Sequence, residues 1–364
     1  MRAVTTINQI IYGLLIWRGM PVTLDDASGL AHIDASNMLG QMTALPDQLL
    51  ASLSSEVHID EGSRKLCLCG LGGSAMGADV LCDHLEATTD AIVSVVRDVR
   101  LPGWVDEETL TIILSYSGNT RETLEMYADA RRHGSRIAVI TSGGRLLQLS
   151  EGSGESIVRV PPGLQPRAAL GHLLGSAAAV LEGAGVSPVA TELRRMVPSL
   201  REDVRTCSAL TPTEDNPAKT IAKSIAGTLP FIYSSRNVRS AGRRWQTQIN
   251  ENSKMLCMYG ELPEADHNQI VGWVDGPKGG KNRPVFLHAS SDRGMMADIV
   301  KATISIFEDF RLDPLVVDLK GETSLESVMR GIVLGDHVSF YLAMLQGIDP
   351  TPVSSITELK KRLG

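Results

Sequence analysis

Short apolar runs alternate with longer amphipathic segments through the first half of the chain. The runs are rich in valine, isoleucine and leucine, which is typical of strands buried between two layers of helices. They cover residues 65–69, 91–97, 110–115, 136–141 and 156–160. Helical spacing of apolar residues predicts helices over residues 75–87, 120–132, 168–185 and 190–206. This alternation predicts an α/β sheet whose strands are mostly parallel.

The second half repeats the pattern. Strands are expected over residues 229–235, 254–259, 284–290 and 313–319, and helices over residues 237–254, 298–310 and 324–347. The polar segment 208–219 carries two prolines and predicts a domain boundary. We therefore expect two doubly wound domains, residues 20–207 with N-terminal helices and residues 208–364 with C-terminal helices. Residues 1–19 contain an apolar run that is too short to span a bilayer. A more typical sequence starts at Met20, so residues 1–19 are expected to be an extension outside the core.

Composition and charge restrict the function classes. The 364 residues are 43% hydrophobic and 21% charged, as in an ordinary globular protein, and the formal net charge is −7. This acidic balance favours neither nucleic acid nor an anionic membrane as a partner, so an anionic substrate needs a local positive pocket. The five cysteines form no C-x-x-C pair, which argues against a disulfide framework or a zinc site. We expect buried thiols and a cytoplasmic protein.

A glycine-rich loop follows the first predicted strand. In "CGLGGSAMGAD", Gly70, Gly72 and Ala75 fit the dinucleotide-binding pattern G-x-G-x-x-G/A. A dinucleotide site also needs an acidic residue at the end of the next strand, where Arg97 and Asp98 give an ambiguous match. We favour the alternative that these glycines let a sugar approach the backbone, with Gly73 and Ser74 lining the site.

A second loop, "SYSGNT", joins a buried strand to a helix. Ser115, Ser117 and Thr120 bring three hydroxyls to the positive end of the helix, together with free backbone N–H groups. That combination predicts a phosphate-binding loop. The alternative is a plain helix cap formed by Ser117 or Thr120, although three hydroxyls are more than a cap requires.

Several stretches together resemble a known family. "SYSGNTRETLE" resembles the signature of the sugar isomerase (SIS) domain, and "GLGGSAMGADVL" is similar to the first loop of the bifunctional phosphoglucose/phosphomannose isomerases. The similarity continues in order through "PPGLQPRAALGHLLG", "NENSKMLCMYGELPEADHNQIVGW" and the tail "LGDHVSFYLAMLQGIDPTPVSSITELKKRL". The resemblance covers residues 20–364. It implies two SIS-type domains and an aldose–ketose isomerase of glucose 6-phosphate or mannose 6-phosphate that needs no cofactor.

The resemblance also assigns site residues. It makes Glu251 the base that moves a proton between C1 and C2, and His267 the group that assists ring opening from across a homodimer interface. Arg167, just inside a helix start, is placed to stabilise the enediolate with its forked donors. Lys360 corresponds to a C-terminal lysine that approaches the site, with Lys361 as the neighbouring choice of register. The alternative for each is a solvated surface residue or helix end.

Other features leave choices open. Thr351, in "DPTPV", is a candidate hydroxyl beside C2, and His337 stands where relatives are expected to carry an aromatic residue. No H-x-H, H-E-x-x-H or carboxylate cluster implies a metal. Two further functions remain: a non-catalytic SIS sugar-phosphate regulator, and a different SIS sugar-phosphate isomerase. The short N-terminal extension leaves too little chain for the DNA-binding domain that such regulators usually carry.

Overall fold

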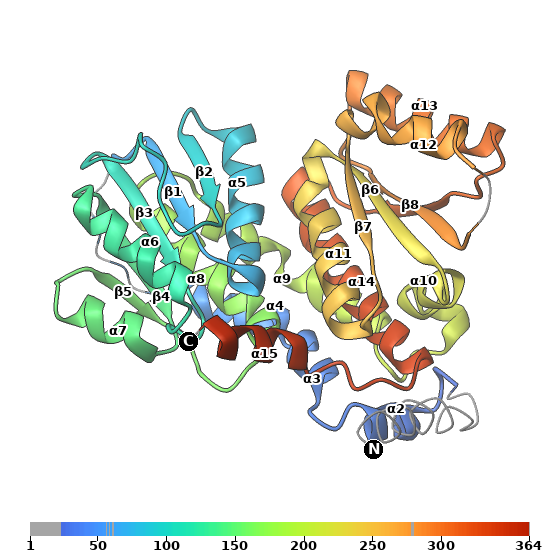
Figure 1. Cartoon of the computed structure of the whole chain (residues 1–364), viewed down its shortest axis with the longest axis horizontal. Helices are drawn as coiled ribbons and strands as arrows, with labels where there is room; N and C mark the ends of the chain where they lie inside the picture. Colours follow the sequence, from blue (N-terminus) through green and yellow to red (C-terminus); the bar gives the residue numbers. More distant parts are fainter. Residues whose placement is uncertain (1–22, 56, 58, 60–61, 278–279, 364) are drawn as a thin grey trace, which may run out of the picture.

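The chain forms two α/β units, each built on its own parallel sheet (Figure 1). The computed structural model describes residues 23–363 apart from residues 56, 58, 60–61 and 278–279. The predicted extension at residues 1–19 lies outside the described residues. The expected fold class, two parallel sheets flanked by helices, is confirmed.

The first sheet has five parallel strands in the order β2-β1-β3-β4-β5. Its strands are β1 (Lys65–Cys69), β2 (Ile92–Val96), β3 (Thr109–Leu114), β4 (Arg136–Thr141) and β5 (Ser156–Arg159). The central strand β3 is buried along its whole length, as its continuous apolar run predicts. From β1 the chain first adds β2 on one side and then crosses to add β3, β4 and β5 on the other side. The direction of winding therefore reverses between β1 and β3. Ligands of open α/β sheets bind in the crevice at such a point, beyond the carboxyl ends of the strands.

Helices cover both faces of this sheet and extend beyond it. Four follow the strands or flank them: α5 (Met76–Thr88), α6 (Arg121–Arg132), α7 (Gly144–Glu151) and α8 (Leu170–Gly183). The N-terminal helices are α2 (Ala27–Ile33), α3 (Met38–Thr43) and α4 (Leu45–Ser52), and α9 (Val189–Thr206) leads out of the unit. Short 3₁₀ turns η1 (Gly72–Ala75) and η2 (Pro166–Ala168) precede α5 and α8. The cysteines of β1 are buried free thiols, as expected.

The second sheet has four parallel strands in the order β7-β6-β8-β9. They are β6 (Leu229–Ser235), β7 (Met258–Leu262), β8 (Asn282–Ala289) and β9 (Leu315–Leu319). The helices of this unit are α10 (Pro217–Ile225), α11 (Arg239–Ser253), α12 (Gln269–Val274), α13 (Gly294–Asp309), α14 (Ser324–Leu345) and α15 (Ser354–Leu363). Further 3₁₀ turns are η3 (Thr213–Asp215), η4 (Arg236–Val238) and η5 (Glu264–His267).

The strand expected at residues 254–259 is wrong for most of its length. Helix α11 ends at Ser253, and Lys254 caps it in a left-handed conformation with φ 54°. The apolar residues that follow form a connection in which Leu256 is 74% exposed, and β7 begins only at Met258. Apolar content alone does not show that a side chain is buried, which is why the sequence misplaced this strand.

The predicted boundary at residues 208–219 links α9 to α10. Its end is tightly packed: Lys219 is buried, and its Nζ donates hydrogen bonds to the carbonyl oxygens of Ala209 and Thr211 and to Asp25 at 3.0 Å. The sheets on either side share no strand, but the division into residues 20–207 and 208–364 stays a prediction.

Helix α14 is the core helix of the second unit. Within the part of the chain that the structure describes, it alone is long and apolar enough to cross a membrane, yet 83% of its apolar window is buried inside the protein. It packs against α9, α10 and α11. Its apolar character is therefore accounted for by packing.

Helices α5 and α11 face each other between the two sheets (Figure 1). Acidic residues of α5 pair with arginines on or near α11: Arg239 with Asp83 at 2.5 Å and with Glu86 at 2.8 Å, and Arg236 with Glu86 at 2.8 Å. This row of ion pairs holds the second unit beside the glycine-rich loop of the first.

Candidate active site

Two hydroxyl-bearing loops meet at the carboxyl ends of β1 and β3, the point where the strand order reverses. The hydroxyl of Ser74 in η1 accepts a hydrogen bond from the backbone N–H of Tyr116 at 3.2 Å, which ties the two loops together. Ser115 is buried, and its Oγ has no hydrogen-bond partner among the described residues. Thr120 stands at the N-cap of α6, but its side chain makes no capping bond. The hydroxyls of Ser115 and Thr120 are therefore not used by a helix cap.

Gly73 lies against the backbone of η2. A Cβ at this position would stand 2.7 Å from the Cα of Arg167 and 2.8 Å from its N. Gly72 has a φ of 53°, in the region that favours glycine. Gly73 is therefore needed for the close contact between the η1 loop and the backbone of Arg167, in addition to any role in the approach of a sugar.

Replacing Gly73 with alanine is expected to lower kcat/KM about a hundredfold, because the η1 loop must move away from Arg167 and small displacements of positioning groups have effects of this size. Steady-state kinetics on the purified variant measure it. Gly103→Ala is the matched control, since a Cβ there meets nothing within 4 Å. Unchanged kcat/KM in Gly73→Ala would show that the contact does not position the site.

Arg167 is fixed by several partners at the junction of the two units. Its side chain is 3% exposed. Its Nε donates to Oδ1 of Asn252 at 2.8 Å, and Nη2 donates to the carbonyl oxygens of Pro350 and Thr351 at 2.9 and 3.0 Å. Its Nη1 lies 3.7 Å from Oε2 of Glu251. Burial lowers the pKa of Arg167, and the nearby Glu251 carboxylate opposes that shift.

A buried ion pair contacts the backbone of Arg167 and helps to hold it in place. Arg244 of α11 donates from Nε and Nη2 to the two carboxylate oxygens of Asp336 of α14, both at 2.7 Å. The same Nη2 donates to the backbone carbonyl of Arg167 at 2.8 Å. The side chains of Arg244 and Asp336 are 2% and 3% exposed. Two helices of the second unit therefore hold the turn that carries Arg167.

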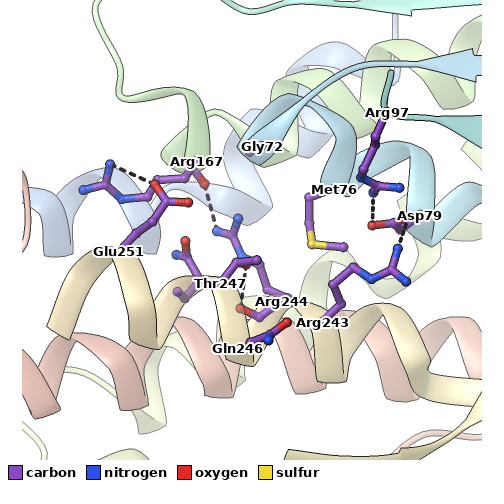
Figure 2. Close-up of a pocket in the computed structure, with 12 residues that line it drawn as sticks. Gly72, Met76, Asp79, Arg97, Arg167, Arg243, Arg244, Gln246, Thr247 and Glu251 are labelled. Atoms are coloured by element: carbon purple, nitrogen blue, oxygen red, sulfur yellow. Dashed lines mark hydrogen bonds and ion pairs between the residues drawn. The ribbon is translucent and has the colours of Figure 1, made fainter. Parts of the chain in front are cut away.

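A pocket of about 300 Å³ opens between these elements (Figure 2). Gly72, Gly73 and Met76 line it from the first unit, and α11 contributes buried and half-buried residues from the second. The remaining lining residues are Asp79, Arg97, Arg167, Arg243, Arg244, Gln246, Thr247, Gln248 and Glu251. Figure 2 shows Glu251 and Arg167 at one end of the pocket. A carboxylate with a partly exposed side chain beside a fixed guanidinium can exchange a proton with a ligand and stabilise the charge that develops on it.

The structure gathers only some of the predicted site residues at this pocket. Gly73, Arg167 and Glu251 line it. Ser74, Ser115, Ser117 and Thr120 belong to the adjoining loops. His267 is exposed on η5, and Lys360 is exposed on α15; neither lines the pocket. Their roles stay predictions.

Lys254 is a residue that the sequence analysis did not select. Its Nζ donates to the carbonyl oxygens of Pro350, at 2.8 Å, and Glu251, at 2.5 Å. Burial lowers the pKa of this amine, and the charge of Arg167 lowers it further. The feature of the sequence that could have identified Lys254 is its position in "NENSK", three residues after Glu251. Thr351 is buried close by, and its Oγ1 has no partner in the described part of the chain.

Fold and family comparisons define the class of protein: a two-unit α/β protein of the SIS type. The structure matches a glucose-6-phosphate isomerase-like protein from Thermus thermophilus with a TM-score of 0.63 and 21% identity, over 93% of this chain and 99% of that one. At that identity the match shows the fold. Residues 214–363 match the family model for the bacterial phospho-glucose isomerase C-terminal SIS domain.

Sequence relatives then give the particular family. A bifunctional phosphoglucose/phosphomannose isomerase from Caldicellulosiruptor bescii is 36% identical over 88% of this chain and 96% of its own length. One from Aquifex aeolicus is 33% identical over 82% of this chain and 90% of its own. The chain belongs to the bifunctional phosphoglucose/phosphomannose isomerase family.

Proposed function

We propose that this chain interconverts glucose 6-phosphate or mannose 6-phosphate with fructose 6-phosphate. The observation that carries the proposal is the carboxylate of Glu251, which faces the pocket 3.7 Å from the buried guanidinium of Arg167. Family membership supports the same activity, because the relatives named above are isomerases of these two sugars.

The proposed chemistry moves one proton between two carbons of the open-chain sugar. Glu251 takes the proton from C2 of the aldose, the electrons of that C–H bond form the C1–C2 double bond, and the electrons of the C1 carbonyl move to O1 to give a cis-enediolate. The proton of the 2-hydroxyl passes to the adjacent O1, the same carboxyl group returns its proton to C1, and the C2–oxygen bond becomes the ketone carbonyl. Arg167 stabilises the negative charge on the enediolate oxygens, a task suited to a guanidinium already fixed by its neighbours. A planar enediolate loses the C2 configuration, so one base serves both epimers if the pocket lets the C2–C3 bond rotate.

The remaining roles are assigned by family resemblance. The hydroxyls of Ser115, Ser117 and Thr120 bind the 6-phosphate, and Gly73 and Ser74 line the sugar site. His267 of a second copy of the chain assists ring opening, which makes the active protein a homodimer, and Lys360 approaches the substrate from α15. In Figure 1, α15 extends from the second unit toward the first. We propose a cytoplasmic enzyme that uses neither a metal nor an organic cofactor.

Initial rates with EDTA present test the function. Glucose 6-phosphate and mannose 6-phosphate are supplied separately, and fructose 6-phosphate is followed. We expect turnover of both sugars. Turnover of glucose 6-phosphate alone would restrict the activity to that epimer. The next residue to test would then be Thr351, the candidate hydroxyl beside C2. Tight binding of sugar phosphate without turnover of either would favour the regulator.

A further inference from the structure

The helix that carries Glu251 ends on a residue in an uncommon conformation. Lys254 follows the last residue of α11 with φ 54° and ψ 28°, in the left-handed region. Glycine usually stands at the left-handed end of a helix, because a Cβ makes this conformation unfavourable. A residue stays in such a conformation only where its surroundings fix it, and residues of this kind gather at functional sites. The contacts of the Lys254 side chain show what fixes it here.

The ammonium of Lys254 joins two distant segments of the chain. Its Nζ donates to the backbone carbonyl oxygen of Glu251 at 2.5 Å. This oxygen is among the last carbonyls of α11, which lack the usual partner within a helix. The same Nζ donates to the carbonyl oxygen of Pro350 at 2.8 Å, in the loop between α14 and α15. Lys254 therefore ties the turn that carries Glu251 to this loop.

Arg167 binds the same carbonyl group. Its Nη2 donates to the carbonyl oxygens of Pro350 and Thr351 at 2.9 and 3.0 Å. The direct contact between Arg167 and Glu251 is looser, at 3.7 Å from Nη1 to Oε2 (Figure 2). The carbonyl of Pro350 is thus a common point that holds Arg167 directly and holds the turn of Glu251 through Lys254.

The charges around the ammonium support this arrangement. Burial and the positive charge of Arg167 lower the pKa of Lys254, so the two cations repel each other. The carboxylates of Glu251 and Asp349 attract both cations. Two positive groups can therefore donate to one oxygen, because two negative groups offset their repulsion.

We propose that Lys254 is a positioning residue for the isomerisation. It holds the last turn of α11 against the carbonyl of Pro350, and so sets where the carboxylate of Glu251 stands relative to the guanidinium of Arg167. This inference rests on the proposed function. Lys254 does not line the pocket, and we assign it no contact with the sugar. Its loss should therefore slow proton transfer more than it weakens substrate binding.

Steady-state kinetics on Lys254→Met test the positioning role. We expect kcat to fall about tenfold for glucose 6-phosphate and mannose 6-phosphate alike, because small displacements of reacting groups have effects of this size or more. KM for each sugar should change less than about twofold. Lys254→Arg keeps a positive charge and several donors, and should recover most of the lost kcat. Lys301→Met is the matched control and should keep full activity, since Lys301 is exposed on α13 and does not line the pocket.

Lys254→Gly separates positioning from stability. Glycine adopts the left-handed conformation without a steric penalty, so relief at this residue offsets the loss of the two hydrogen bonds. We expect thermal denaturation to give a Tm within a few degrees of wild type. The kcat of Lys254→Gly should nevertheless fall about tenfold, as in Lys254→Met.

Four outcomes would overturn the inference. Full kcat in Lys254→Met would show that the ammonium positions nothing. Equal losses of kcat in Lys254→Met and Lys254→Arg would show that the charge does not hold the turn. A loss of both kcat and Tm that Lys254→Gly restores would assign the effect to folding. A rise in KM with unchanged kcat would make Lys254 a substrate-binding residue.

Hydrogen exchange separates this inference from the proposed function, because it needs no turnover. Amides in the last turn of α11 and in residues 349–353 should exchange about tenfold faster in Lys254→Met than in wild type, and Lys301→Met should leave them unchanged. If wild type isomerises neither sugar while exchange rises in Lys254→Met, the proposed function fails and the connection through Pro350 stands. If wild type isomerises both sugars while kcat and exchange are unchanged in Lys254→Met, the inference alone fails.

Discussion

Glu251→Gln is expected to lower kcat for glucose 6-phosphate and mannose 6-phosphate together, by about 10²- to 10⁴-fold, the usual contribution of a positioned general base. The amide has nearly the same size as the carboxylate but cannot accept the C2 proton. Because one base is proposed to serve both epimers, the two losses should agree. Initial-rate measurements at saturating substrate give kcat for each sugar.

Binding and fold should survive this substitution. The side chain of Glu251 is 25% exposed and lies 3.7 Å from Arg167, so the amide replaces no short hydrogen bond to the guanidinium. Calorimetric affinity for fructose 6-phosphate should stay within a few-fold of wild type. Glu202→Gln, at an exposed position on α9, is the matched control and should keep full activity. Loss of one activity only would show that the epimers use different bases, and retention of both would remove Glu251 from the mechanism.

Local sequence patterns predicted what lies along one strand or one loop. The apolar runs from 65–69 to 156–160 became the five strands of the first sheet. The signal is clearest for β1, β3 and β4, because strands buried on both faces leave a continuous apolar run. The loop at residues 115–120 could also be predicted from the sequence, because a polar run directly after a buried strand indicates a loop at the end of that strand. The strand predicted at residues 254–259 was wrong for most of its length, because an exposed apolar connection has the same sequence pattern as a buried strand.

Contacts between distant segments could not be predicted in this way. Arg244 and Asp336 are 92 positions apart, and each looks like an ordinary polar residue of a helix. Their pairing depends on how α11 packs against α14. The same holds for Arg167, whose partners Pro350 and Thr351 lie more than 180 positions away. The sequence therefore indicated candidates for the chemistry, which stay predictions, and the structure shows what holds Arg167 in place.

Arg244→Met is expected to lower the free energy of unfolding by about 3–5 kcal/mol, because it leaves the carboxylate of Asp336 buried without its partner. This is a large part of the roughly 5–15 kcal/mol that typically stabilises a folded protein. Urea denaturation followed by circular dichroism measures the loss. A change below about 1 kcal/mol would mean that Asp336 finds water or another donor.

The double variant Arg244→Met/Asp336→Leu separates stability from positioning. Replacing both members of a buried ion pair with apolar side chains of similar size is often neutral or stabilising, so much of the lost stability should return. Catalysis should not return, because neither new side chain can donate to the carbonyl oxygen of Arg167. We expect kcat of the stable double variant to remain at least about tenfold below wild type, since small displacements of a positioning group have effects of this size or more. Recovery of both stability and kcat would mean that the pair only fills space, whereas recovery of stability alone would show that Arg244 positions the guanidinium of Arg167 for catalysis.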